Sequence, residues 1–384
     1  MRKFIVSSLL ASLLMAQAVL AFQTPQTKSG GVATPRPAGK KSGIDAARIE
    51  RIPARMQTFV NRNRTAGIVT LVAHKGSVAG LSAVGYQDLE TKTPMKSDSI
   101  FQIASMTKPI TAVGIMILVD EGLLALTDPV EKYLPKFAEI KLQVKAAETQ
   151  AGSELSEIRK PARQITIKDL LTHTSGIGGG YPEGFKDLFN KRDRTLAEAV
   201  DAFPQRMLDF EPGTKWGYSN MGIATLGRII EIVSLKSYEE FITDRIFQPL
   251  GMKDSHFFVP ESKYNRVASM YRLDGNKLTK ADVDLYRKDA KYPSPEAGLY
   301  STAPDLFNFH QMMLNGGVLN NQRVLSKASV GLMTQVQTNE LKAGFSPGIG
   351  FGLGWAVVRN VEGMFRLNSI GTYGHGGLYR TYVF

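Results

Sequence analysis

The sequence contains no cysteine among its 384 residues. The chain therefore forms no disulfide, and its core must be stable without covalent cross-links. The same absence excludes a thiol nucleophile and any metal site built on cysteine. The sequence also lacks the His-Glu-x-x-His zinc motif and the Walker phosphate-binding loop, so neither a zinc protease of that type nor a P-loop enzyme is indicated.

Basic residues outnumber acidic ones, which gives the chain a formal net charge of +12 at pH 7. Ordinary solvated surface charge is the default interpretation, and attraction to anionic polymers such as those of a cell envelope is the alternative that this charge allows. Nucleic-acid binding is not predicted, because no dense Lys/Arg tract is interleaved with aromatic residues and no nucleic-acid-binding motif is present.

The N-terminus has the pattern of a secretory signal peptide. Met1-Arg-Lys supplies positive charge, an apolar run follows to Leu20, and Val19-Leu-Ala21 fits a small-residue cleavage site. A membrane anchor is the alternative, but the run is short and is interrupted by Ser and Gln. We therefore predict a signal peptide over residues 1–21, a disordered linker over residues 22–43, no stable membrane span after cleavage, and a periplasmic or secreted protein.

Residues 44–384 are predicted to form one folded domain. Apolar residues at helical spacing predict helices over residues 44–64, 107–124, 128–135, 221–235, 238–247 and 304–315. Runs rich in β-formers predict a hairpin of residues 67–74 and 78–86, and strands over residues 354–358 and 379–384. Residues 141–164 are polar and charged and predict a surface segment, while residues 260–296 are polar and loop-rich. Both segments are candidates to line the active-site cleft. The order predicts an α/β (α+β) fold, with one antiparallel sheet built from both chain ends, flanking helices and an inserted, mostly helical lobe.

Ser105-Met-Thr-Lys108 is the only place where a lysine follows a serine by three residues. The motif opens an apolar helical run, and positions i and i+3 of a helix share a face. A neutral amine at Lys108 could therefore take the proton of the Ser105 hydroxyl and make it a nucleophile. The alternative is an ordinary helix N-terminus with a solvated lysine.

Two further patterns follow in order along the chain. Tyr218-Ser-Asn220 is the only Tyr-x-Asn sequence, and His375-Gly-Gly377 comes just before the last predicted strand. Taken singly, Tyr218 could be a core aromatic and Asn220 a turn residue. His74-Lys-Gly76 repeats the His-x-Gly spacing, but it lies in the predicted turn of the first hairpin.

The ordered set resembles the serine β-lactamase and penicillin-binding-protein superfamily. The likeness is closest to the class C β-lactamase-like branch, which includes DD-peptidases, D-amino-acid peptidases and lactamase-like esterases. Three sequence segments around and between the motifs strengthen the resemblance: Leu170-Leu-Thr-His-Thr-Ser-Gly-Ile177, Glu211-Pro-Gly-Thr-Lys-Trp-Gly-Tyr-Ser-Asn220 and Ile246-Phe-Gln-Pro-Leu-Gly-Met-Lys-Asp-Ser-His256. The resemblance implies a β-lactamase/DD-peptidase-like fold and no metal or organic cofactor.

The resemblance assigns the catalytic roles to three residues. Ser105 would attack a carbonyl and form an acyl-enzyme. Lys108 would be the base for that step, since burial disfavours its cation. Tyr218 would relay a proton to the leaving group and help to activate the deacylating water. Which of Lys108 and Tyr218 is the acylation base stays open at this point.

The resemblance also implies the residues that bind substrate. Asn220 would hydrogen-bond Lys108 and the amide oxygen of the substrate. His375 stands where a lysine is expected, and a partly charged histidine anchors a substrate carboxylate less firmly. This departure weakens the case for an efficient β-lactamase.

The oxyanion hole would be formed by the backbone N–H groups of Ser105 and Leu378. Gly376 and Gly377 would let a substrate approach their strand closely. His173, in the Thr-His-Thr-Ser-Gly loop, is interpreted as structural, because small hydroxyl residues stabilise tight loops.

These observations predict an exported serine hydrolase that cleaves an ester or amide bond of a peptide or small molecule, of DD-peptidase, D-amino-acid-peptidase or esterase type. A true β-lactamase and a non-catalytic binding member of the same fold are the alternatives. Because related proteins continue past this point with another strand and a helix, we also expect the chain to be a fragment truncated at its C-terminus.

Overall fold

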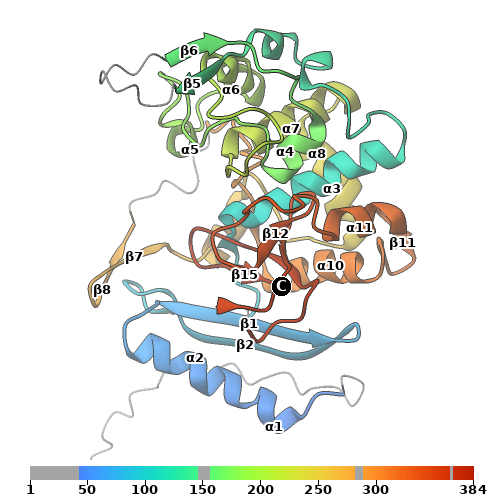
Figure 1. Ribbon diagram of the computed structural model, residues 1–384. Helices are drawn as coiled ribbons and strands as arrows, with labels where there is room; N and C mark the ends of the chain where they lie inside the picture. Colours follow the sequence, from blue (N-terminus) through green and yellow to red (C-terminus); the bar gives the residue numbers. More distant parts are fainter. Residues whose placement is uncertain (1–42, 146–155, 282–288, 364–365) are drawn as a thin grey trace, which may run out of the picture.

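The computed structural model describes residues 43–145, 156–281, 289–363 and 366–384. The predicted signal peptide (residues 1–21) and residues 22–42 of the predicted linker lie outside these ranges. The described residues form a mixed α/β structure, as predicted, with strands toward both chain ends and a helical lobe between them (Figure 1). No described helix is both long enough and apolar enough to span a membrane.

The first sheet is an N-terminal hairpin covered by helices. β1 (Gly67–His74) pairs antiparallel with β2 (Ser77–Asp88), and the short β3 (Thr93–Pro94) pairs with β2. Below the sheet in Figure 1 lie α1 (Ala46–Ile49) and α2 (Arg51–Asn61), while α10 (Ala303–Leu314) packs against β1 from above. The predicted hairpin is confirmed. The helix predicted over residues 44–64 corresponds to α1 and α2, and the helix predicted over residues 304–315 corresponds to α10.

The C-terminal residues form a second antiparallel sheet. Its strands follow chain order: β12 (Ile349–Phe351), β13 (Ala356–Val358), β14 (Tyr373–Gly376) and β15 (Tyr382–Val383). Within the described ranges no ladder joins the two sheets, so the expected single sheet built from both chain ends is instead two sheets. Pairing needs a shared edge of extended backbone, and β15, two residues long, is hydrogen-bonded to β14 alone.

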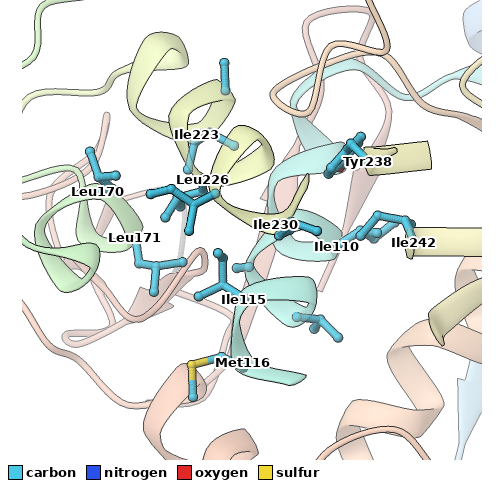
Figure 2. Close-up of a cluster of buried hydrophobic side chains, with 14 of the residues drawn as sticks. Ile110, Ile115, Met116, Leu170, Leu171, Ile223, Leu226, Ile230, Tyr238 and Ile242 are labelled. Carbon is cyan, nitrogen blue, oxygen red and sulfur yellow. The ribbon is translucent and has the colours of Figure 1, made fainter. Parts of the chain in front are cut away.

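Helix α3 (Thr107–Asp120) is the centre of the helical lobe. All its residues from Thr107 to Leu118 are buried, and it packs against α7 (Asn220–Ser234) and α8 (Tyr238–Ile242). Figure 2 shows the apolar side chains of this contact, with α3 in the middle. A helix that is apolar on every side is stable only inside such a core. The packing therefore anchors the helix turn that carries Lys108.

Shorter elements connect these parts. The other helical segments are η1 (Ala104–Met106), η2 (Val130–Lys132), η3 (Pro135–Glu139), α4 (Ile167–Thr172), α5 (Leu188–Lys191), α6 (Leu196–Ala202), η4 (Phe203–Gln205), η5 (Thr243–Phe247), α9 (Gln248–Leu250), η6 (Glu261–Arg266) and α11 (Lys327–Thr334). The other strands form antiparallel pairs: β4 (Phe101–Gln102) with β9 (Tyr300–Ser301), β5 (Leu142–Lys145) with β6 (Ser156–Arg159), β7 (Tyr271–Asp274) with β8 (Lys277–Lys280), and β10 (Val318–Leu319) with β11 (Gln322–Arg323).

Several predicted elements differ in extent from those observed. The helix expected over residues 107–124 ends at Asp120, because Gly122 takes a left-handed φ of 70° and turns the chain. The helix expected over residues 128–135 is replaced by two short 3-10 segments, η2 and η3. The carboxylate of Asp128 accepts hydrogen bonds from Ala125 N–H and Lys132 Nζ, which stabilises a local turn rather than a helix.

Candidate active site

Ser105 lies in the 3-10 turn η1, immediately before α3. The residue in front of it, Ala104, has a φ of 46°, a left-handed value that costs a non-glycine residue free energy. The Thr107 hydroxyl donates a hydrogen bond of 2.7 Å to the Ala104 carbonyl and stabilises this bend. Sequence reasoning had no signal for this strain. The bend presents Ser105 at the start of the buried helix, where strained backbone is typical of functional sites.

Lys108 is close to Ser105 and completely buried. Its Nζ lies 3.1 Å from Ser105 Oγ and donates a second hydrogen bond of 2.8 Å to the carbonyl of Glu296. Burial lowers the pKa of Lys108 to about 7, although the charge of Glu296 acts in the opposite direction. The alternative of a solvated lysine is wrong. A large fraction of the Lys108 amines is therefore neutral at physiological pH and able to accept a proton.

Tyr218 contacts both of these residues. Its hydroxyl is hydrogen-bonded to Ser105, and Lys108 Nζ lies 4.8 Å from the centre of its ring. Burial raises the pKa of Tyr218 above its usual value, so the phenol keeps its proton at neutral pH. The structure thus brings together Ser105, Lys108 and Tyr218, with Lys108 as the group that can be neutral and basic.

The loop around His173 holds Tyr218 in place. The ring centre of His173 lies 4.5 Å from that of Tyr218, and His173 Nδ1 accepts a hydrogen bond of 3.2 Å from Ser219 N–H. Its carbonyl accepts another, of 2.8 Å, from Gly217 N–H. Burial lowers the pKa of His173 well below its usual value, so the ring is neutral. These contacts support the structural interpretation of this loop.

Asn220 is the first residue of α7, and Ser219 caps that helix by accepting a 3.0 Å hydrogen bond from Gly222 N–H. The turn alternative for Asn220 is therefore wrong. The expected bond from Asn220 to Lys108 is not formed either, because Lys108 Nζ is directed to Ser105 and Glu296. Within the described residues the buried Oδ1 of Asn220 has no hydrogen-bond partner, so the amide can still bind a ligand.

His375 is buried at the end of β14, just before the last strand β15, so its predicted place before the final strand is confirmed. Its Nδ1 donates a 2.9 Å hydrogen bond to the carbonyl of Gly376, and its ring centre lies 6.3 Å from that of Tyr218. Burial, and next the charge of Lys108, lower the pKa of His375 to about 4. The ring is therefore neutral at pH 7. His74, from the other His-x-Gly pattern, is exposed at the end of β1 in the first sheet.

The need for glycine is clear at Gly377. A Cβ there would lie 2.3 Å from the carbonyl oxygen of Ile103, and the Thr381 hydroxyl donates a 3.2 Å hydrogen bond to that same carbonyl. Gly377 thus lets the end of β14 pack against the residue two positions before Ser105. Gly376 is exposed and less crowded, and Leu378 is 75% exposed.

Sequence reasoning missed two parts of the site. The sequence predicts residues 260–296 only as a polar, loop-rich segment that could line the cleft, and it does not single out Glu296, which is buried and accepts a hydrogen bond from Lys108 at its backbone carbonyl. Phe345 was also missed: it is 77% exposed, and its ring centre lies 5.1 Å from that of Tyr218 and 5.4 Å from that of Trp216. No sequence pattern pointed to either residue, because both reach the site from distant parts of the chain.

A second serine motif was also overlooked. Gly344-Phe-Ser346-Pro-Gly348 has the Gly-x-Ser-x-Gly spacing of an α/β-hydrolase nucleophile, which lies on a sharp turn between a strand and a helix. Ser346 instead lies in the loop between α11 and β12, so that context is missing. Among the described residues no group of three or more His, Asp or Glu side chains is arranged to hold a metal ion.

Several known proteins are similar to this chain. A family model described as Beta-lactamase matches residues 52–384. Penicillin-binding protein 4 of Amycolatopsis lactamdurans is 33% identical, over 75% of this chain and 68% of that protein. Esterase EstB of Burkholderia gladioli is 29% identical, over 88% of this chain and 87% of that protein. The solved structure of EstCE1, a hydrolase with promiscuous acyltransferase activity, superposes with a TM-score of 0.71 at 25% identity and covers 87% of this chain and 88% of its own.

Proposed function

The chain belongs to the beta-lactamase family, and from that membership we propose that it is a serine hydrolase which cleaves an ester or amide bond through an acyl-enzyme on Ser105. One observation carries the proposal: a completely buried lysine, with a pKa of about 7, lies 3.1 Å from the hydroxyl of a serine. Such a pair supplies a nucleophile and a base matched to neutral pH.

In acylation, Ser105 Oγ attacks the substrate carbonyl carbon while its proton moves to Lys108 Nζ. Tyr218 keeps its own proton at neutral pH, so Lys108 is the base. When the tetrahedral intermediate collapses, the Tyr218 hydroxyl gives its proton to the leaving group and is reprotonated by the Lys108 ammonium, which becomes neutral again. The backbone N–H groups of Ser105 and Leu378 stabilise the oxyanion. Water then attacks the acyl-enzyme and gives a proton to Lys108 and Tyr218. That proton returns to Ser105 Oγ as the bond between Oγ and the acyl carbon breaks, and the acid product leaves.

The surroundings favour an uncharged ester as substrate. His375 carries no positive charge at pH 7, so it offers a substrate carboxylate no ion pair. The exposed ring of Phe345 beside Tyr218 offers an apolar acyl or alcohol group a surface to pack on. The likeness to Esterase EstB supports the same substrate class.

A panel of three substrates tests the proposal. Initial rates are measured with p-nitrophenyl butyrate, a D-Ala-D-Ala peptide and a chromogenic cephalosporin. We expect kcat/KM to be highest for the ester, because the other two present a carboxylate to a neutral His375. Faster hydrolysis of the peptide would assign the protein to the peptidase branch, and faster hydrolysis of the cephalosporin would make it a β-lactamase; either result contradicts the ester assignment.

We also propose that the protein is exported and loses its first 21 residues. The support is the basic start, apolar run and small residues of positions 1–21. When the protein is expressed in a bacterial host with its own N-terminus, mass spectrometry is expected to find a mature chain that begins at Phe22 in the extracytoplasmic fraction. An intact Met1 terminus in the cytoplasm would contradict export.

A further inference from the structure

Glu296 is a fully buried carboxylate beside the proposed base. Its Oε1 accepts hydrogen bonds from Tyr181 OH at 2.9 Å and from Tyr292 OH at 3.2 Å, and its Oε2 lies 3.2 Å from the same Tyr292 hydroxyl. Burying a carboxylate costs free energy unless its charge finds partners. The proposed mechanism makes no use of this side chain, so its retention in the core needs an explanation.

The segment that carries Glu296 is fastened to the first turns of α3. The Glu296 carbonyl accepts the 2.8 Å hydrogen bond from Lys108, and the neighbouring Pro295 carbonyl accepts one of 2.6 Å from Thr111 Oγ1. Leu299 N–H donates to Thr107 Oγ1 at 3.2 Å. Three contacts along one side of α3 therefore hold Glu296 in a defined position relative to Lys108.

We propose that Glu296 is a positioning residue whose carboxylate charge, held by Tyr181 and Tyr292, stabilises the ammonium that Lys108 becomes when it takes the Ser105 proton. The proposal rests on the function proposed above. Burial alone disfavours the ammonium form, and an opposite charge nearby favours it. A base is most effective when its pKa lies near the working pH. Glu296 thus prevents burial from making Lys108 too weak a base.

The other titratable groups around Glu296 and Lys108 contribute little charge. Burial lowers the pKa of both histidines near Lys108 and raises the pKa of each surrounding tyrosine, so all of them are neutral at pH 7: His173, His375, Tyr181, Tyr218, Tyr238 and Tyr292. The charge of Glu296 acts on Lys108 directly and raises its pKa against the effect of burial. Removing that charge while keeping the shape of the side chain is therefore a clean perturbation.

The test compares the wild type with Glu296→Gln, with Tyr181→Phe as the matched control that keeps the carboxylate. For Glu296→Gln we expect the acid limb of kcat/KM to move down by about one pH unit, the scale of one nearby charge. The limb of Tyr181→Phe is expected to move much less. If Glu296 had a purely structural role, Glu296→Gln would lower the rate at every pH without changing the pH midpoint of the acid limb of kcat/KM. That result would overturn the proposal.

A second measurement separates this inference from the proposed function. Lysines are labelled with 13C at Cε, and the Lys108 signal is identified by its loss in Lys108→Met. We expect its NMR titration in Glu296→Gln to fall by about one pH unit relative to the wild type. An unchanged titration would refute the role of Glu296 even in an active enzyme. A lowered titration in a protein that hydrolyses no ester would support that role and refute the proposed function instead.

Discussion

Ser105→Ala is expected to reduce ester hydrolysis by roughly 10⁴-fold or more, the scale of losing the nucleophile in a serine hydrolase. The reason is geometric, since Ser105 Oγ is the hydroxyl that contacts both Lys108 Nζ and Tyr218. Rates with p-nitrophenyl butyrate measure the loss. Intact-protein mass spectrometry with an active-site-directed phosphonate should show one adduct on the wild type and none on the variant.

Ser346→Ala is the matched control for that experiment. Ser346 occupies the middle of the Gly-x-Ser-x-Gly pattern but lies in the loop before β12. We expect this variant to keep its phosphonate adduct and to remain within a few-fold of the wild-type rate. If Ser346→Ala loses the adduct and Ser105→Ala retains it, the nucleophile has been assigned to the wrong serine.

Lys108→Met is expected to lower kcat/KM by about 10²- to 10⁴-fold, the usual contribution of a general base. In the wild type, activity needs the neutral amine of Lys108, whose pKa is about 7. The wild-type kcat/KM should therefore rise with pH up to about 7 and then level off, whereas the variant should lack that limb. A variant with the wild-type rate and pH profile would exclude Lys108 as the base.

The same variant tests the cost of burying Lys108. The folded protein lowers the pKa of Lys108 from 10.5 to about 7, so between these values the unfolded chain binds more protons than the folded one. The stability contributed by this group therefore rises with pH from about 7 to about 10 and is lowest below pH 7. In urea unfolding, the stability of Lys108→Met relative to the wild type should fall as the pH rises through this window. A constant difference would show that the pKa is not shifted.

Local patterns in the sequence predicted the longest helices and strands of the structure. The apolar spacing before residue 64 and after residue 303 marked helices that the structure contains, and the turn at Lys75-Gly76 marked the β1–β2 hairpin. The strands of the second sheet were predicted less well, since β12 and β14 were missed and β15 is shorter than expected. Those strands are two to four residues long, and their pairing partners, not their own composition, define them.

For the candidate site, too, some properties follow from the sequence alone and others only from the tertiary structure. The sequence alone determined the order and spacing of Ser105, Lys108, Tyr218 and His375, because these are properties of the chain and its motifs. Only the tertiary structure decided which of these groups carries charge. The pKa of Lys108 depends on burial and on Glu296, which lies 188 residues away in sequence, and burial likewise leaves His375 neutral. A pKa responds to the local dielectric and to neighbouring charges, and both are created when distant segments pack together.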